Sequence, residues 1–205
     1  MVAALVHARK LGHVPTTAFA LYHRTLLHGV LATDATALVA GGRELAQLGR
    51  EHRFEMWQVC GELLRGLGEA QAAGTDATLR AAERQLVDFE DMGVVYRPLY
   101  STFLARICLA SGNVERGAEH LDTTFALVER SAERWSTSLT WRTAGELALT
   151  GSDPDPERAG RCFDAAVKAA IDAGAVRWLD EARHCRDALR GAEPSTVAGP
   201  PPPPG

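Results

Sequence analysis

Lysine is scarce in this chain of 205 residues, because Lys10 and Lys168 are the only lysines among its 22 basic residues. Basic residues are also outnumbered, since 26 aspartates and glutamates leave a formal net charge of −4. A general nucleic-acid binder carries a basic excess that neutralises phosphates. The charge balance therefore disfavours a role in direct nucleic-acid binding.

Long apolar runs are missing as well. The apolar residues 1–6 are followed by His7, Arg9 and Lys10, so this stretch is too short for the core of a signal peptide. No segment approaches the roughly 20 apolar residues that a membrane span requires. The sequence predicts a cytoplasmic protein with no membrane partner.

Closely spaced cysteines are absent too. The chain has four cysteines, none of them in a CxxC pair: Cys60, Cys108, Cys162 and Cys185. A zinc knuckle needs closely spaced thiolates, and a secreted disulfide scaffold is denser in cysteine. The cysteines are therefore predicted to be reduced, buried thiols.

Apolar residues recur at spacings of three and four, and no strict alternation lasts long enough for a strand. Two such stripes are Leu79, Ala82, Leu86 and Phe89, and Trp178, Ala182, Cys185 and Leu189. Glycines and N-capping residues separate the stripes at residues 12–15, 33–34, 74–76, 93, 111–113 and 151–156. This pattern predicts an all-α fold of about nine helices.

The predicted helix boundaries are periodic. Aromatic residues stand near helix starts at spacings of 39, 39 and 43 residues: Trp57, Tyr96, Trp135 and Trp178. Glycines end helices at spacings of 38 and 39 residues: Gly74, Gly112 and Gly151. The cap sequence Thr-Asp-Ala-Thr at residues 33–36 returns at residues 75–78. Self-similarity at about 40 residues, with two helices per unit, predicts a helical solenoid.

Within the repeat, the pattern of small and large residues is that of a degenerate tetratricopeptide unit. It is clearest in Trp141, Ala144, Gly145 and Ala148, followed by Ala159, Phe163 and Ala166. Glycine inside a helix costs about 1 kcal/mol against alanine, so Gly68 and Gly145 are predicted to permit a close helix approach. The sequence predicts a right-handed tetratricopeptide-like superhelix of about four hairpins plus a C-terminal capping helix, over residues 1–190.

Glu-Arg-Trp at residues 133–135, followed by Arg-Thr-Ala-Gly-Glu-Leu-Ala-Leu at 142–149, resembles a characteristic stretch of one group of bacterial regulators. In that group it lies in the C-terminal helical-repeat region of proteins that join a class III adenylate cyclase domain to an AAA-type ATPase. Further segments fit the same region: residues 22–23, 51–54 with Trp57, 112–119, 153–157, 162–166 and 173–175. The resemblance covers residues 1 to about 190 and implies an interaction arm in signalling or transcriptional control.

The chain also departs from that group. The cyclase and nucleotide-binding domains that precede the repeats there are missing from this sequence. No GxxxxGK[ST] loop is present, and Gly-Gly-Arg-Glu at residues 41–44 does not supply one. Residues 136–141 read Ser-Thr-Ser-Leu-Thr-Trp where the relatives carry a more acidic run. Cyclase and ATPase activity are therefore not carried over, and the chain is expected to be a scaffold or sensor arm, standing alone or detached.

Residues suited to catalysis or metal binding are not arranged for either task. No histidine stands in an HExxH motif, and His23 and His28 face different sides of a helix. There is no GxSxG motif, and His184 and Cys185 diverge because they are adjacent on a helix. The carboxylates at residues 153–157 precede a predicted helix, where capping explains them. The sequence predicts no metal, no cofactor and no enzymatic activity.

The concave groove of the solenoid is the remaining candidate surface. With the repeats superposed on Gly68, Ala105 and Gly145, two rows of residues are predicted to face inward. These rows are Arg65, Thr102 and Arg142, and Glu69, Arg106 and Glu146. Such a ladder of mixed charge suits an extended peptide or the acidic end of a partner. The alternative is a solvated face whose Arg–Glu pairs stabilise each helix by a few tenths of a kcal/mol.

Residues 191–205 include five consecutive prolines and are predicted to be a disordered, polyproline-like tail. The function expected for the whole chain is a non-catalytic protein–protein interaction scaffold. Two alternatives stay open. One is a small-molecule sensor that binds an inducer in the groove, and the other is a truncated remnant of a larger regulator with an open apolar N-terminal face.

Overall fold

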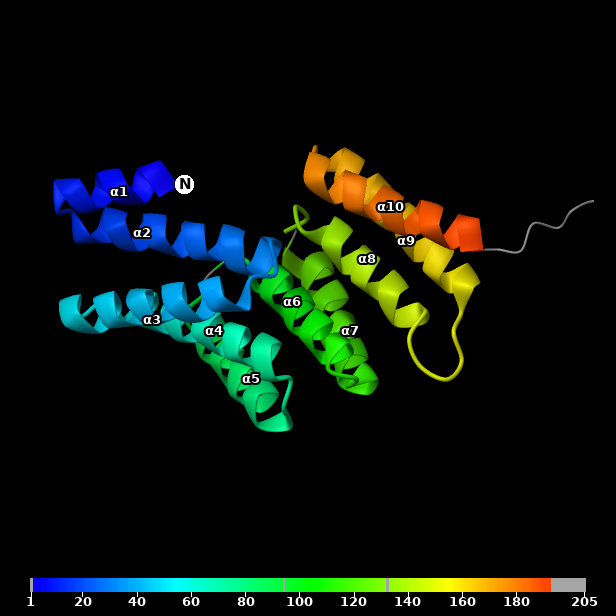
Figure 1. The fold of residues 1–205 in the computed structure, drawn as a ribbon, viewed down its shortest axis with the longest axis horizontal. Helices are drawn as coiled ribbons and strands as arrows, with labels where there is room; N and C mark the ends of the chain where they lie inside the picture. Colours follow the sequence, from blue (N-terminus) through cyan, green and yellow to red (C-terminus); the bar gives the residue numbers. More distant parts are fainter. Residues whose placement is uncertain (1, 94, 132, 193–205) are drawn as a thin grey trace, which may run out of the picture. The chain divides into compact units, whose positions relative to one another are not determined.

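The structure, a computed structural model, describes residues 2–93, 95–131 and 133–192. Within these ranges it contains ten α-helices, one π-helix and no strand (Figure 1). The predicted all-α fold is confirmed. The predicted tail begins inside the last helix, which extends to Ala192, and its remaining residues 193–205 lie outside the described part.

The chain forms two compact units, Met1–Ser136 and Thr137–Gly205, within what the sequence predicted as one repeat domain over residues 1–190. The first unit holds α1 (Val2–Leu11), α2 (Val14–Thr25), the π-helix η1 (Leu26–Leu31), α3 (Ala35–His52), α4 (Glu55–Ala73), α5 (Asp76–Asp91), α6 (Arg97–Ala110) and α7 (Val114–Ser131). The second unit holds α8 (Thr137–Ala148), α9 (Pro156–Asp172) and α10 (Val176–Ala192). Within each unit, consecutive helices pack against one another, most extensively in the antiparallel hairpins α3–α4, α6–α7 and α8–α9.

The predicted capping residues begin their helices. The Thr75 hydroxyl accepts a hydrogen bond from the Thr78 N–H at the start of α5, at 3.3 Å. Asp155 accepts from the Arg158 N–H at 2.8 Å and caps α9, as expected for the carboxylates at residues 153–157. Each bond satisfies an N–H group that has no partner inside the helix. Gly74, with φ of +59°, ends α4 in the left-handed conformation that glycine adopts at low cost.

The two copies of Thr-Asp-Ala-Thr do not cap in the same register. In the second copy the threonine is the cap, whereas in the first copy Asp34 caps α3 and accepts from the Ala37 N–H at 3.0 Å. The first copy follows the π-helix η1, and the Asp34 N–H donates back to the Gly29 carbonyl. Thr33 therefore takes a φ of +58° and the cap moves by one residue. Sequence identity alone did not indicate this shift.

Apolar burial follows the predicted helical stripes. Leu79, Ala82, Leu86 and Phe89 of α5 are all buried. In the second unit, Phe163 packs with Ala148 and Ala159, and Leu189 covers that cluster. Fully burying a large apolar side chain contributes about 1.5–3 kcal/mol, so these stripes hold the hairpins together.

Glycines allow the helices of the largest hairpins to approach closely. A Cβ on Gly68 would lie 2.7 Å from the Leu38 Cβ, and a Cβ on Gly145 would overlap the Phe163 ring. These contacts confirm the predicted role of both glycines. The closest approach was not predicted: a Cβ on Gly61 would overlap the backbone nitrogen of Ala46, and one on Gly42 would lie 2.5 Å from the Arg65 nitrogen.

Candidate functional site

Two of the predicted groove residues, Arg65 and Glu69, lie together on α4. The Arg65 guanidinium donates to Glu69 at 2.7 Å and to Glu62 at 2.7 Å and 2.9 Å. Arginines from α3 extend this contact at both ends. We call the resulting group the charged strip; it consists of Arg43, Arg50, Glu62, Arg65 and Glu69.

The centre and the ends of the charged strip differ in how tightly they are held. Burial alone would lower the pKa of Arg65, but its hydrogen bonds to Glu62 and Glu69 outweigh this effect and raise that pKa. Arg65 is therefore a fixed charge. Arg43 is 68% exposed, and its guanidinium lies 3.7 Å from Glu69. It is the more available cation of the strip.

The predicted residues of the second unit, Arg142 and Glu146, also lie on one helix. Arg142 is only 12% exposed, and its Nη1 lies 3.0 Å from Glu181 of α10, while Glu146 lies 3.8 Å from its Nε. Arg142 therefore joins α8 to α10 within this unit. It contributes to the packing of the unit more than to an open surface.

The predicted positions on α6 are placed differently from one another. Thr102 is fully buried, and its hydroxyl donates to the Pro98 carbonyl at 2.9 Å. Thr102 therefore presents no surface to a partner, contrary to its predicted inward-facing row. The cause is that α6 is buried along most of its length, so a polar residue in that row falls inside the core. Arg106 on the same helix is partly exposed.

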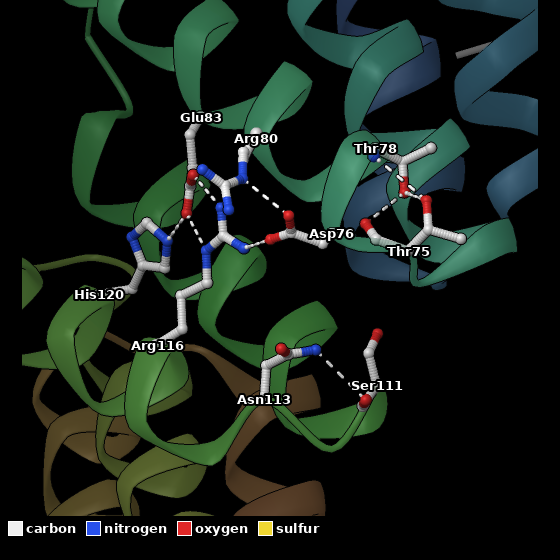
Figure 2. Close-up of polar contacts among 9 residues, drawn as sticks. All are labelled: Thr75, Asp76, Thr78, Arg80, Glu83, Ser111, Asn113, Arg116 and His120. Atoms are coloured by element: carbon white, nitrogen blue, oxygen red, sulfur yellow. Dashed lines mark hydrogen bonds and ion pairs between the residues drawn. The ribbon is translucent and has the colours of Figure 1, made fainter.

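A second polar network, which the sequence did not single out, joins α5 to α7 (Figure 2). Arg116 of α7 donates to Glu83 at 2.6 Å and to Asp76 at 2.8 Å, and the His120 ring lies 3.0 Å from Glu83. Burial would raise the pKa of Glu83, but the bonds from Arg116 and His120 lower it overall. These partners are 33, 37 and 40 residues apart. The repeat period of about 40 residues is thus the sequence signal that could have found them.

The periodic aromatic residues of the first unit form a continuous cluster. The Tyr96 and Trp135 rings, 39 residues apart, have centroids at 5.4 Å, and Tyr22 lies 5.7 Å from Trp57 and 6.5 Å from Tyr96. Glu133 accepts from the Tyr96 N–H at 3.2 Å and from the Trp135 indole N–H at 3.0 Å. Tyr96 has a φ of +80°, which is rare for an aromatic residue, and Glu133 holds it there.

The cysteines are free, and Cys60, Cys108 and Cys162 are buried as predicted, whereas Cys185 is only partly buried. Burial raises the pKa of the Cys60 thiol to about 12 and that of Cys108 to about 11. It also raises the pKa values of Cys162 and Cys185. A thiol with a raised pKa stays protonated near neutral pH and is a weak nucleophile.

The described part of the chain contains neither a candidate metal site nor a candidate membrane span. No group of three or more His, Cys, Asp or Glu side chains lies where it could hold a metal ion. No helix has both the length and the apolar character needed to cross a membrane.

A pocket of about 240 Å³ opens beside the π-helix of the first unit. Residues of α2, η1 and α3, together with the N-cap of α3, line it: Arg24, Thr25, His28, Asp34, Ala37, Ala40 and Gly41. The sequence pattern does not connect these positions, and it had raised His28 only as a possible metal ligand. The π-helix that brings them together has no simple sequence signature.

Comparison with known proteins adds no relative, since no protein-family model, curated protein or solved structure matches the chain.

Proposed function

We propose that this protein is a non-catalytic scaffold that binds a protein partner through its helical repeats. The proposed architecture is a tetratricopeptide-like right-handed superhelix, and the proposed setting is bacterial signalling or transcriptional regulation. Support comes from the resemblance to the repeat arm of ATPase/adenylate cyclase regulators and from the repeat period that joins Tyr96 to Trp135. Stacked helical hairpins leave extended faces on which partners of such proteins bind.

The observation that carries the proposal is the charged strip. It combines three arginines with two glutamates on neighbouring faces of α3 and α4. The inner pair, Arg65 and Glu69, is partly buried and fixed, while Arg43 and Arg50 are more than half exposed. A surplus of one positive charge, with the outer arginines more than half exposed, suits the acidic segment of a partner.

Capture of partners on the immobilised protein, from a lysate of its own organism, tests this proposal. The test variant combines Arg65→Gln with Glu69→Gln, which removes both charges of the inner pair without changing the net charge. Glu62 keeps its contact with Arg50, and Arg43, which loses Glu69, is well exposed to water. The matched control combines Arg161→Gln with Glu157→Gln, an i,i+4 pair of the same type on α9. We expect a partner that the wild-type protein and the control retain and the test variant loses.

Retention of the same partner by the test variant would exclude the charged strip as its binding site. No partner above background in any sample would contradict the scaffold function itself. Thermal unfolding of all three proteins belongs to the experiment, because a loss of binding is informative only if the variants remain folded.

The pocket beside the π-helix favours a second candidate function, small-molecule sensing. It is a concave site that brings charged side chains together with small apolar ones, as small-ligand sites commonly do. In this candidate the ligand occupies the pocket, and its binding is relayed to a partner elsewhere on the chain.

A further inference from the structure

We propose that the pocket beside the π-helix binds a small aliphatic α-amino acid. In this site Arg24 pairs with the carboxylate, Asp34 with the ammonium group, and the Thr25 hydroxyl completes the carboxylate contacts. The inference rests on the sensing candidate and is independent of the charged strip.

The first observation in favour of a bound carboxylate is the state of Arg24. It is partly buried, and among the described residues no carboxylate lies within ion-pair distance of it. Other partly buried arginines are paired, as Arg65 is with Glu62 and Glu69, and Arg116 with Asp76 and Glu83. A guanidinium that has lost part of its water needs a replacement partner, and a carboxylate meets its two parallel N–H groups best.

The second observation in favour of a ligand is the buried Thr25 hydroxyl. Thr25 is 2% exposed, and its Oγ1 has no hydrogen-bond partner. A buried polar group without a partner destabilises the protein unless something else uses it. Gly41 preserves the space around it, because a Cβ at Gly41 would overlap this hydroxyl. Thr25 and Gly41 both line the pocket.

The Asp34 carboxylate, which lines the same pocket as Arg24, indicates that the ligand carries a positive as well as a negative group. Asp34 lines the pocket together with Arg24, yet no ion pair joins the two side chains. One Asp34 oxygen caps α3 through the Ala37 N–H. A simple anion would be repelled by Asp34 and a simple amine by Arg24, whereas an amino acid places one charge against each. The ammonium group would share Asp34 with the helix cap.

The volume and the apolar lining of the pocket restrict which amino acids can fit. A cavity of about 240 Å³ is smaller than those that hold drug-sized molecules, which measure roughly 300–1,000 Å³. The methyl groups of Ala37 and Ala40 leave room for a short aliphatic side chain and offer it no polar partner. Valine is therefore a suitable probe.

Isothermal titration of the full chain with three matched probes tests the site. L-Valine carries both charged groups, isovalerate lacks the ammonium group, and isobutylamine lacks the carboxylate. We expect L-valine to bind saturably at one site, and both analogues to bind at least about tenfold more weakly. Absence of L-valine binding, or equal affinity for all three probes, would overturn the proposal.

Single substitutions test which side chain contacts the carboxylate of L-valine and which contacts its ammonium group. Arg24→Gln and Asp34→Asn are each expected to weaken L-valine binding about tenfold, and asparagine keeps the N-cap of α3 intact. Arg80→Gln, which removes the same charge from an exposed position of α5 outside both the pocket and the charged strip, is the control and should bind as the wild type does. Unchanged affinity in Asp34→Asn would contradict recognition of the ammonium group.

Thr25→Val separates a binding role from a structural one. Valine has nearly the shape of threonine but lacks the hydroxyl, so the variant should bind L-valine more weakly while unfolding at the same or a higher temperature. A variant that is less stable and binds equally well would show that the hydroxyl serves the fold. Failure of all ligand binding leaves the partner-capture result unaffected, so the scaffold and the amino-acid site are tested separately.

Discussion

Two hairpins, α3–α4 in the first unit and α8–α9 in the second, reach close contact by different means. In α3–α4 the missing side chain of Gly61 makes room for the backbone of Ala46, whereas in α8–α9 that of Gly145 makes room for the Phe163 ring. A helix backbone makes room only if the whole helix shifts and loses packing, whereas a single ring can rotate or shift. The same residue type therefore tolerates substitution to very different degrees.

Gly61→Ala should have the largest effect on folding. Its methyl group meets backbone on α3, so the two helices must separate, and overpacking of this kind costs about 3 kcal/mol. Urea unfolding followed by circular dichroism measures the loss. A cost below about 1 kcal/mol would show that α3 and α4 can move apart freely.

Gly145→Ala should cost less, about 1 kcal/mol, because the Phe163 ring can yield and alanine favours the helix. Combined with Phe163→Leu, the same substitution should cost nothing further, since the smaller side chain leaves space. Gly160→Ala on α9 is the matched control. Its nearest neighbour would lie at an ordinary 3.7 Å, so it should stabilise the protein by about 1 kcal/mol. Equal losses in Gly145→Ala with and without Phe163→Leu would contradict this explanation.

The α5–α7 contact depends on charge, so it should respond to pH. The pKa of Glu83 is lowered in the folded protein, so its contribution is present above the pKa of the unfolded carboxyl group and is lost as the pH falls through the folded value. Glu83→Gln should lower the free energy of unfolding by about 1 kcal/mol at pH 7. Denaturant unfolding from pH 7 to pH 3 should show this difference shrink. A difference that is constant with pH would rule out the ionised carboxylate as its source.

Arg65→Gln should have the smallest effect on stability, about 0.5 kcal/mol, although Arg65 contacts two carboxylates. If close contact between the two backbones holds α3 against α4, the ion pairs of Arg65 add little to the free energy of unfolding. Thermal unfolding at low and high salt measures this contribution, which should decrease further in salt. A loss as large as that of Gly61→Ala would show that charge, not backbone contact, holds this hairpin.

Features that depend on neighbouring residues were predictable from the sequence. The caps at Thr75 and Asp155 and the buried stripe of α5 follow from residues a few positions apart. The repeat period also relates Tyr96 to Trp135, whose ring centroids lie 5.4 Å apart, although it was not used to predict a contact between them. It misplaced Thr102, because a period gives the position along a helix but not how deeply that helix is buried.

Features that arise from two distant segments were not predictable. Gly42 and Gly61 mark the closest approach of α3 and α4, yet nothing beside either residue distinguishes it from a glycine that faces solvent. The π-helix η1 shifts the helical register and gathers Arg24, Thr25 and Asp34 around one pocket. Its sequence, Leu-Leu-His-Gly-Val-Leu, would also suit an α-helix. Such sites become visible only when the backbone path is known.

Hydrogen–deuterium exchange of the protein with and without its captured partner tests the interaction surface most directly. The account predicts that the partner slows exchange in the segment of α4 that spans residues 62–69 and in the facing part of α3, and that the variant with Arg65→Gln and Glu69→Gln loses this protection. Protection confined to other helices, with α3 and α4 exchanging as in the free protein, would contradict the charged strip as the binding surface.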